Sequence, residues 1–160
     1  MRRRDREIAD RGEMLKILRG CDVCSVAFND DGAPYVIEMN FGLLDEEKPT
    51  LCFHCAGAGR KLELLRRDDR VGFFASRGHR LEWQDGGRCT MRYESVAGRG
   101  RMRVAEDGEK RAAMERLMAH YRPETARAPG EPGWLAALDA TTVLLLDVEE
   151  MSGKRSAAKD

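Results

Sequence analysis

The sequence predicts a mainly β protein of the α+β class, in which one antiparallel sheet closes into a small barrel with helices at its ends. Strand-like runs follow one another through hairpin turn signals such as Asp30-Asp31-Gly32. Regular alternation of strands and helices is absent, and no dinucleotide-binding or nucleotide phosphate-loop glycine motif occurs, so a doubly wound parallel sheet is not expected. The 160 residues suit one domain, placed at 1–150, with a polar tail at 151–160.

Three segments carry helical signals. Residues 5–19 contain Asp10 followed by Glu13, which resembles an N-cap with its capping partner. A second helix, residues 60–67, starts with two basic residues. The third, residues 106–121, is the clearest because its apolar residues fall at i, i+3, i+4 and i+7. Those residues are Met114, Leu117, Met118 and Tyr121.

The strands are expected wherever β-branched, aromatic and apolar residues run between turn signals. The segments 77–88 and 122–133 are expected to be loops because glycine, proline and polar residues dominate them. The expected strands are residues 21–29, 34–44, 50–55, 71–75, 89–104 and 141–148.

Composition excludes several classes of partner. The chain has 28 basic and 28 acidic residues, so its net charge gives no general attraction to nucleic acid or to a membrane surface. No apolar run approaches the ~20 residues of a membrane span, and no secretory signal opens the chain. We therefore expect a cytoplasmic protein whose five cysteines are thiols rather than disulfides.

Two CxxC pairs raise the alternative of a zinc site. Cys21 with Cys24 and Cys52 with Cys55 have ligand-like spacing. Within a strand, residues i and i+3 point to opposite faces, which opposes metal binding. A turn at the edge of each strand could still bring the sulfurs together, so zinc stays a minor alternative to ordinary buried thiols, and no metal is predicted.

The stretch 51–67 combines a strand, a glycine-spaced turn and a basic helix start. Gly59, Arg60 and Lys61 open the helix, where backbone N–H groups and the helix dipole favour an anion such as phosphate. His54 lies at the preceding strand end. It is either a partly buried strand histidine or a pocket residue that can donate a hydrogen bond or move a proton near neutral pH.

Four segments, MRRRDREI, DGAPYVIEMNF, FHCAGAGRKLELLRRDDRV and YESVAGRGR, together resemble the nitroimidazole-resistance-type flavoproteins. These belong to the pyridoxamine 5′-phosphate oxidase-like family, with the FMN-binding split-barrel fold. The resemblance runs from Arg2 to about Val148. Two features depart from it: Cys52 and Cys55 flank His54, and the polar segment after residue 76 is hard to place.

The resemblance implies a homodimer with two flavin sites at its interface, usually holding FMN, with FAD as the alternative. It implies that Gly59, Arg60 and Lys61 bind the flavin phosphate at the helix start, and that the ring lies along Glu38, Met39, Asn40 and Phe41 of the second strand. It also implies that His54 lies near the ring as the catalytic candidate, and that Ser95 and Val96 reach the flavin from the partner subunit.

The leading functional hypothesis is therefore an FMN-dependent oxidoreductase. It would use a reduced nicotinamide cofactor or another donor to reduce a small organic acceptor such as a nitroaromatic compound. The alternative is a non-catalytic flavin- or cofactor-binding protein, a carrier or a sensor. Family membership does not decide between them, because function depends on the site rather than on the fold.

Overall fold

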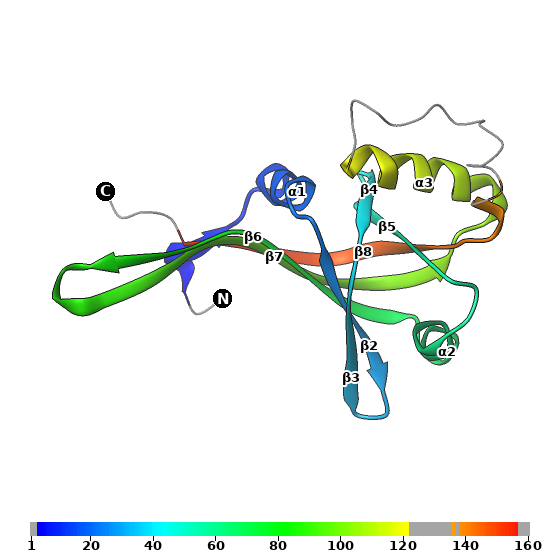
Figure 1. The fold of residues 1–160 in the computed structure, drawn as a ribbon, viewed down its shortest axis with the longest axis horizontal. Helices are drawn as coiled ribbons and strands as arrows, with labels where there is room; N and C mark the ends of the chain where they lie inside the picture. The colour runs from blue at the N-terminus through cyan, green and yellow to red at the C-terminus, as the bar shows by residue number, and fades with distance from the viewer. Residues whose placement is uncertain (1–2, 122–135, 137, 157–160) are drawn as a thin grey trace.

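The computed structural model describes residues 3–121, 136 and 138–156. In these residues eight strands form one sheet in the order β3-β2-β6-β7-β8-β5-β4, and β1 pairs with β8 (Figure 1). The strands are β1 (Glu7–Ile8), β2 (Cys24–Asp30), β3 (Ala33–Met39), β4 (Phe41–Asp45), β5 (Thr50–Cys55), β6 (Arg70–Gln84), β7 (Arg88–Val104) and β8 (Thr142–Arg155). The helices are α1 (Arg11–Arg19), α2 (Arg60–Arg67) and α3 (Asp107–Tyr121), with 3-10 turns at Arg4–Arg6 and Asp85–Gly87.

Every pairing in the sheet is antiparallel. The sheet curls into a barrel that stays open, because β3 and β4 occupy its two ends and are joined only through Asn40. The predicted mainly β, antiparallel split barrel with flanking helices is confirmed, whereas the expected closure is not. The expected strand 34–44 is broken at Asn40, and this break produces the split.

Alternation along the strands places the apolar core inside the barrel. Each fully buried Phe, Leu or Val side chain contributes roughly 1.5–3 kcal/mol by leaving water. The inward side chains that are at most 4% exposed include Val26, Phe28, Phe41, Leu51, Phe53, Phe73, Val96, Met102, Leu144 and Leu146. These side chains form one continuous core cluster inside the barrel.

The helices cover different parts of this barrel. Helix α1 begins as predicted, with the Asp10 side chain accepting a hydrogen bond from the Glu13 N–H at 2.7 Å. Helix α3 packs on the outer side of β4, β5 and β8. Its approach to β4 is close, since a Cβ on Gly42 would lie 2.8 Å from the backbone of Leu117. No described helix is both long enough and apolar enough to span a membrane.

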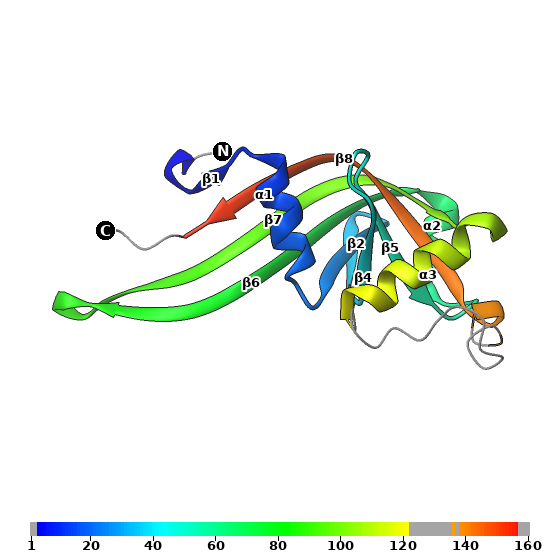
Figure 2. The same ribbon diagram turned by 90° about the horizontal axis from the view of Figure 1, so that it is seen from above.

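Two sequence predictions of irregular structure are wrong. The expected loop 77–88 is mostly strand, because β6 and β7 continue as a hairpin that projects from the body (Figures 1 and 2). A register shift between Arg77 and Arg80 absorbs Gly78, which has φ +67°. The expected polar tail 151–160 is strand as far as Arg155, where β8 pairs with β7 and β1. The loop expected at 122–133 lies outside the described residues.

Candidate functional site

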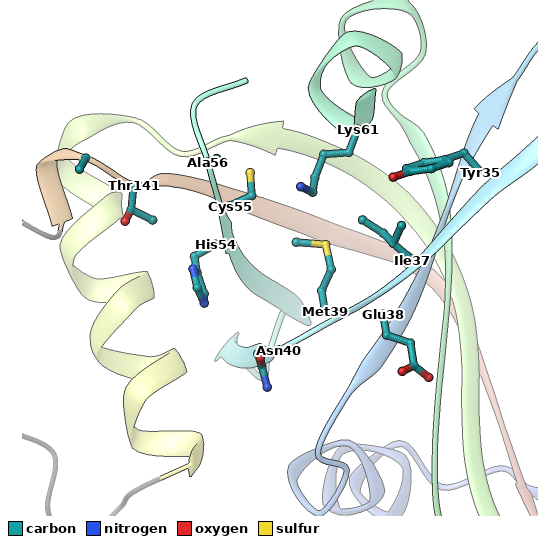
Figure 3. Close-up of a pocket in the computed structure, with 11 residues that line it drawn as sticks. Tyr35, Ile37, Glu38, Met39, Asn40, His54, Cys55, Ala56, Lys61 and Thr141 are labelled. Atoms are coloured by element: carbon teal, nitrogen blue, oxygen red, sulfur yellow. The ribbon is translucent and has the colours of Figure 1, made fainter. Parts of the chain in front are cut away.

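An open pocket of about 560 Å³ lies at the split of the barrel. Its walls come from β3, from the end of β5, from the first turn of α2 and from the residues just before β8 (Figure 3). This volume is within the range of small-molecule sites, and the mixture of apolar and polar walls is typical of them. The lining residues are Tyr35, Ile37, Glu38, Met39, Asn40, His54, Cys55, Ala56, Lys61, Ala140 and Thr141.

Alternation on β3 supplies the apolar wall. Tyr35, Ile37 and Met39 share one side of the strand, and Ile37 pairs directly with the buried Val26 of β2. Glu38 therefore lies on the opposite side, and in Figure 3 its carboxylate points away from Lys61. The β3 edge of the pocket thus presents a phenol ring and two aliphatic side chains to a ligand, with a carboxylate at the rim.

The end of β5 brings two side chains to opposite sides of the sheet. Cys55 packs against the barrel core and points toward the Lys61 side of the pocket (Figure 3). His54 pairs with Val143, which belongs to the cluster beneath α3, so the imidazole lies on the α3 side. Asn40 and Thr141 line the same pocket. The pocket therefore wraps around the strand end, with the thiol and the imidazole on different walls.

The first turn of α2 supplies the positive end of the pocket. Gly59 caps the helix with φ +132°, a conformation that favours glycine, although a Cβ there would meet nothing within 4 Å. The Gly59 carbonyl accepts hydrogen bonds from the N–H groups of Leu62 and Glu63 at 3.0 and 3.2 Å. Lys61 adds its ammonium group to the pocket. A helix N-terminus beside a lysine favours an anionic group such as phosphate.

Arg60 and Lys61 have different roles in the structure. The Arg60 guanidinium donates two hydrogen bonds to the Asp30 carboxylate, from Nη2 at 2.5 Å and from Nε at 3.2 Å. These hydrogen bonds hold the pKa of Asp30 below its ordinary value. Arg60 does not line the pocket. In the described chain Lys61 therefore lines the pocket, whereas the Arg60 guanidinium is paired with a carboxylate of the β2–β3 turn.

Three other predicted cofactor-binding residues lie away from the pocket lining. Phe41 is fully buried, with its ring centroid 6.4 Å from that of Phe53, so it is a core residue. Val96 is also fully buried, in the core of its own chain. Ser95 lies on β7 and is 5% exposed. By contrast, Glu38, Met39, Asn40, His54 and Lys61 meet at the pocket as predicted residues.

Sequence reasoning missed six lining residues. Tyr35 and Ile37 could have been found, because they share the face of Met39 in an alternating strand. The others depend on pairing between distant segments: β5 and β8 bring residue 56 beside residues 140–141. The missed residues are Tyr35, Ile37, Cys55, Ala56, Ala140 and Thr141.

All five cysteines are free thiols, of which Cys21, Cys24 and Cys52 are buried, Cys55 is partly buried and Cys89 is exposed. Burial raises the pKa of Cys21 and of Cys52 to about 11, and that of Cys24 to about 12. The Cys52 thiol donates to the carbonyls of Gly42 and Ala113, at 3.4 and 3.2 Å. Among the residues that the structure describes, no three His, Cys, Asp or Glu side chains are grouped as metal ligands. The zinc alternative therefore gains no support.

Comparison with known proteins follows this geometry. The model of the pyridoxamine 5′-phosphate oxidase family matches residues 10–155. The chain belongs to the pyridoxamine 5′-phosphate oxidase-like family. A candidate 5-nitroimidazole antibiotic resistance protein from Bacteroides thetaiotaomicron is 34% identical, with a TM-score of 0.78, over 92% of this chain and 85% of its own. The resemblance to the nitroimidazole-resistance proteins is thereby confirmed.

Two further structures share the fold at lower identity. The FAD and heme binding protein from Mycobacterium smegmatis is 21% identical, with a TM-score of 0.80, over 97% of this chain and 76% of its own. The flavocytochrome Anf3 from Azotobacter vinelandii is 20% identical, with a TM-score of 0.78, over 99% and 72%. The comparison with curated proteins found no match.

Proposed function

We propose that this protein binds a flavin, with FMN as the favoured form, in the pocket at the split of the barrel. The observation that carries the proposal is the Lys61 ammonium at the N-terminus of α2, facing an apolar β3 wall across one open pocket. A phosphate needs the first feature and a flat aromatic ring needs the second. The FAD and heme binding protein from M. smegmatis and the flavocytochrome from A. vinelandii, which share the fold, support the assignment.

The residues of the pocket divide between the two ends of such a ligand. Lys61 and the free N–H groups at the start of α2 would hold the phosphate, and FAD would present the same group. Ile37 and Met39 would pack against the ring, and Asn40 would offer hydrogen bonds at its edge. The flavin supplies the redox chemistry when it is bound, and the protein orients it and limits the access of water.

The activity proposed for this site is reduction of a small organic acceptor, with a nitroaromatic compound as the first substrate to test. The support is the 34% identity, over most of both chains, with the candidate 5-nitroimidazole resistance protein. His54 is the proposed proton donor, because it lines the pocket on the wall opposite the thiol. The electron donor would be a reduced nicotinamide cofactor or another small reductant.

A homodimer is part of the proposal. The pocket is open along the split, so a second copy could supply a further wall and exclude water from the ring. A cytoplasmic location is proposed as well. Its support is that Cys21, Cys24, Cys52, Cys55 and Cys89 are all free thiols, which a reducing compartment preserves.

A non-catalytic flavin protein, a carrier or a sensor, is the second candidate. The observation that favours it is the pocket lining, which among the described residues holds a single histidine, His54. The neighbour from M. smegmatis is likewise named as an FAD and heme binding protein.

One experiment tests binding and turnover in turn. Purified protein is reconstituted with FMN, desalted and titrated anaerobically with NADH, NADPH and dithionite, and then mixed with a 5-nitroimidazole. Enzyme function predicts reoxidation of the bound flavin with consumption of the nitro compound over many cycles. A flavin that is reduced but never reoxidised by the acceptor supports the carrier or sensor. Protein that retains no flavin contradicts both.

A further inference from the structure

The strand break at Asn40 opens the barrel and also borders the pocket. Strand β3 ends at Met39 and β4 begins at Phe41, so Asn40 alone joins the two ends of the sheet. Met39 is buried and Asn40 is exposed, and both line the pocket (Figure 3). The position of the break therefore decides where the Asn40 amide lies relative to a ligand.

The register of the sheet shows which pairing the break prevents. Strands β2 and β3 pair in one continuous register as far as Cys24 with Met39. Two further steps of the same antiparallel register would place Phe41 directly opposite Asp22. The ladder stops before that point, and a side chain from α3 lies between the backbones of these two residues.

That side chain is Tyr121, the last residue of α3, whose end lies beside β4 in Figures 1 and 2. Its hydroxyl accepts a hydrogen bond from the Phe41 N–H at 3.0 Å and donates one to the Asp22 carbonyl at 2.7 Å. Both distances are ordinary for hydrogen bonds. One phenol thus satisfies a backbone donor of β4 and a backbone acceptor of the connector before β2, and it keeps the two segments apart.

The preceding residue, His120, ties the end of α3 to the same connector. Its Nε2–H donates to the Cys21 carbonyl at 2.9 Å, since a carbonyl oxygen can only accept. The imidazole centroid also lies 4.9 Å from the centroid of the buried Phe41 ring. Phe41 is therefore held through its backbone by Tyr121 and through its ring by His120. Asn40, one residue earlier, is held at one end by these contacts.

We propose that Tyr121 is a positioning residue of the flavin pocket, which acts through Phe41 and Asn40 and does not touch the ligand. The inference rests on the proposed function, in which Asn40 offers hydrogen bonds at the edge of the ring. In the described chain Tyr121 is not among the residues that line the pocket. A binding group works only when the contacts around it fix its place, and a displacement of about 1 Å is enough to lose its effect.

Replacing the phenol by a phenyl ring removes the hydrogen bonds and keeps the ring. In Tyr121→Phe the aromatic ring still separates Phe41 from Asp22, but the Phe41 N–H and the Asp22 carbonyl lose their shared partner. Unpaired backbone groups at a partly buried site are costly, so the break relaxes until they find water or another partner, and Asn40 moves with it. The FMN dissociation constant should rise about 3- to 10-fold, the effect of one neutral hydrogen bond.

The test is a double-mutant cycle on the full chain. FMN dissociation constants are measured by fluorescence titration for wild type, Tyr121→Phe, Asn40→Ala and the double variant. If the phenol acts through Asn40, Tyr121→Phe should weaken binding when Asn40 is present and add less than about 2-fold once it is alanine. The matched control is Tyr93→Phe, which removes the same hydroxyl group from a β7 residue outside the pocket lining and should leave the constant unchanged.

A second measurement follows the strand break without any ligand. Hydrogen exchange of the Phe41 amide, resolved by NMR, should become at least ~10-fold faster in Tyr121→Phe and stay unchanged in Tyr93→Phe. Circular dichroism spectra that match wild type establish that both variants are folded.

The possible results separate this inference from the proposed function. No loss of FMN affinity in Tyr121→Phe, or an equal loss with and without the Asn40 side chain, overturns the positioning role while the flavin site stands. An unchanged exchange rate of the Phe41 amide overturns the hold of Tyr121 on the strand break. A wild type that binds no flavin overturns the proposed function and the positioning role together.

Discussion

Removing the Lys61 ammonium should weaken the binding of flavins that carry a phosphate. In the structure Lys61 lines the pocket at the first turn of α2, while the neighbouring Arg60 is held by Asp30. A charge-assisted hydrogen bond is worth roughly 1.5–3 kcal/mol, and the lower half of that range applies to a half-buried lysine. Lys61→Ala should therefore raise the FMN dissociation constant about 10- to 30-fold.

The matched control is Arg60→Ala, which removes the same charge one residue earlier. Because Asp30 already occupies that guanidinium, we expect the FMN dissociation constant to rise less than about 3-fold, under 0.7 kcal/mol. Fluorescence titration with FMN and with riboflavin separates phosphate from ring, since riboflavin lacks the phosphate and should bind both variants as it binds wild type. Equal losses in the two variants, a larger loss in Arg60→Ala, or a loss of riboflavin affinity in Lys61→Ala would refute this reasoning.

Three further predictions concern packing, pH and the pocket thiol. Gly42→Ala should lower the free energy of unfolding by roughly 1–3 kcal/mol, because the new methyl group meets the backbone of α3. Thermal unfolding should show no such loss for the control Gly108→Ala, whose methyl group meets open space. Burial raises the pKa of Glu94, but hydrogen bonds from Arg77 and Arg155 outweigh it and hold the pKa below the ordinary 4.5. The ionised Glu94 should therefore stabilise the fold by about 1 kcal/mol after solvent screening, in full above pH 4.5, and this stabilisation should be lost as the pH falls through the lowered pKa. Unfolding midpoints measured against pH should show that loss for wild type and not for Glu94→Gln. In a Cys89→Ser background, mass spectrometry after alkylation should find Cys55 modified before the buried cysteines, and bound FMN should slow that modification. Alkylation of Cys55 at the same rate with and without FMN would place the flavin elsewhere.

The sequence predicted the parts of the fold that depend on local pattern. The cap of α1 by Asp10, the hairpin turn at residues 30–32 and the alternation of β2 all appear in the structure. The projecting β6–β7 hairpin was mistaken for a loop because glycines and charges dominate residues 77–88, and only the pairing of β6 with β7 makes that segment a strand. The end of β8 was mistaken for a tail for the same reason, since its partners lie far away in the sequence.

The candidate site was predicted in part for a related reason. A strand followed by a glycine turn and a basic helix start is a local signal, so Lys61 and His54 were found. Arg60 is held by Asp30, which precedes it by thirty residues at the end of β2, whereas Lys61 lines the pocket. Sequence spacing could not reveal that partner. It also could not reveal that Phe41, next to the pocket residue Asn40, turns into the core once the strand has broken.

The central claim is that a flavin lies at the split of the barrel, with its phosphate at the start of α2. A crystal structure of the protein with FMN tests it most directly. The account predicts the phosphate beside Lys61 and the α2 backbone N–H groups, with the ring against Ile37 and Met39. An FMN molecule bound away from the split, or with its phosphate turned from Lys61, would contradict the account.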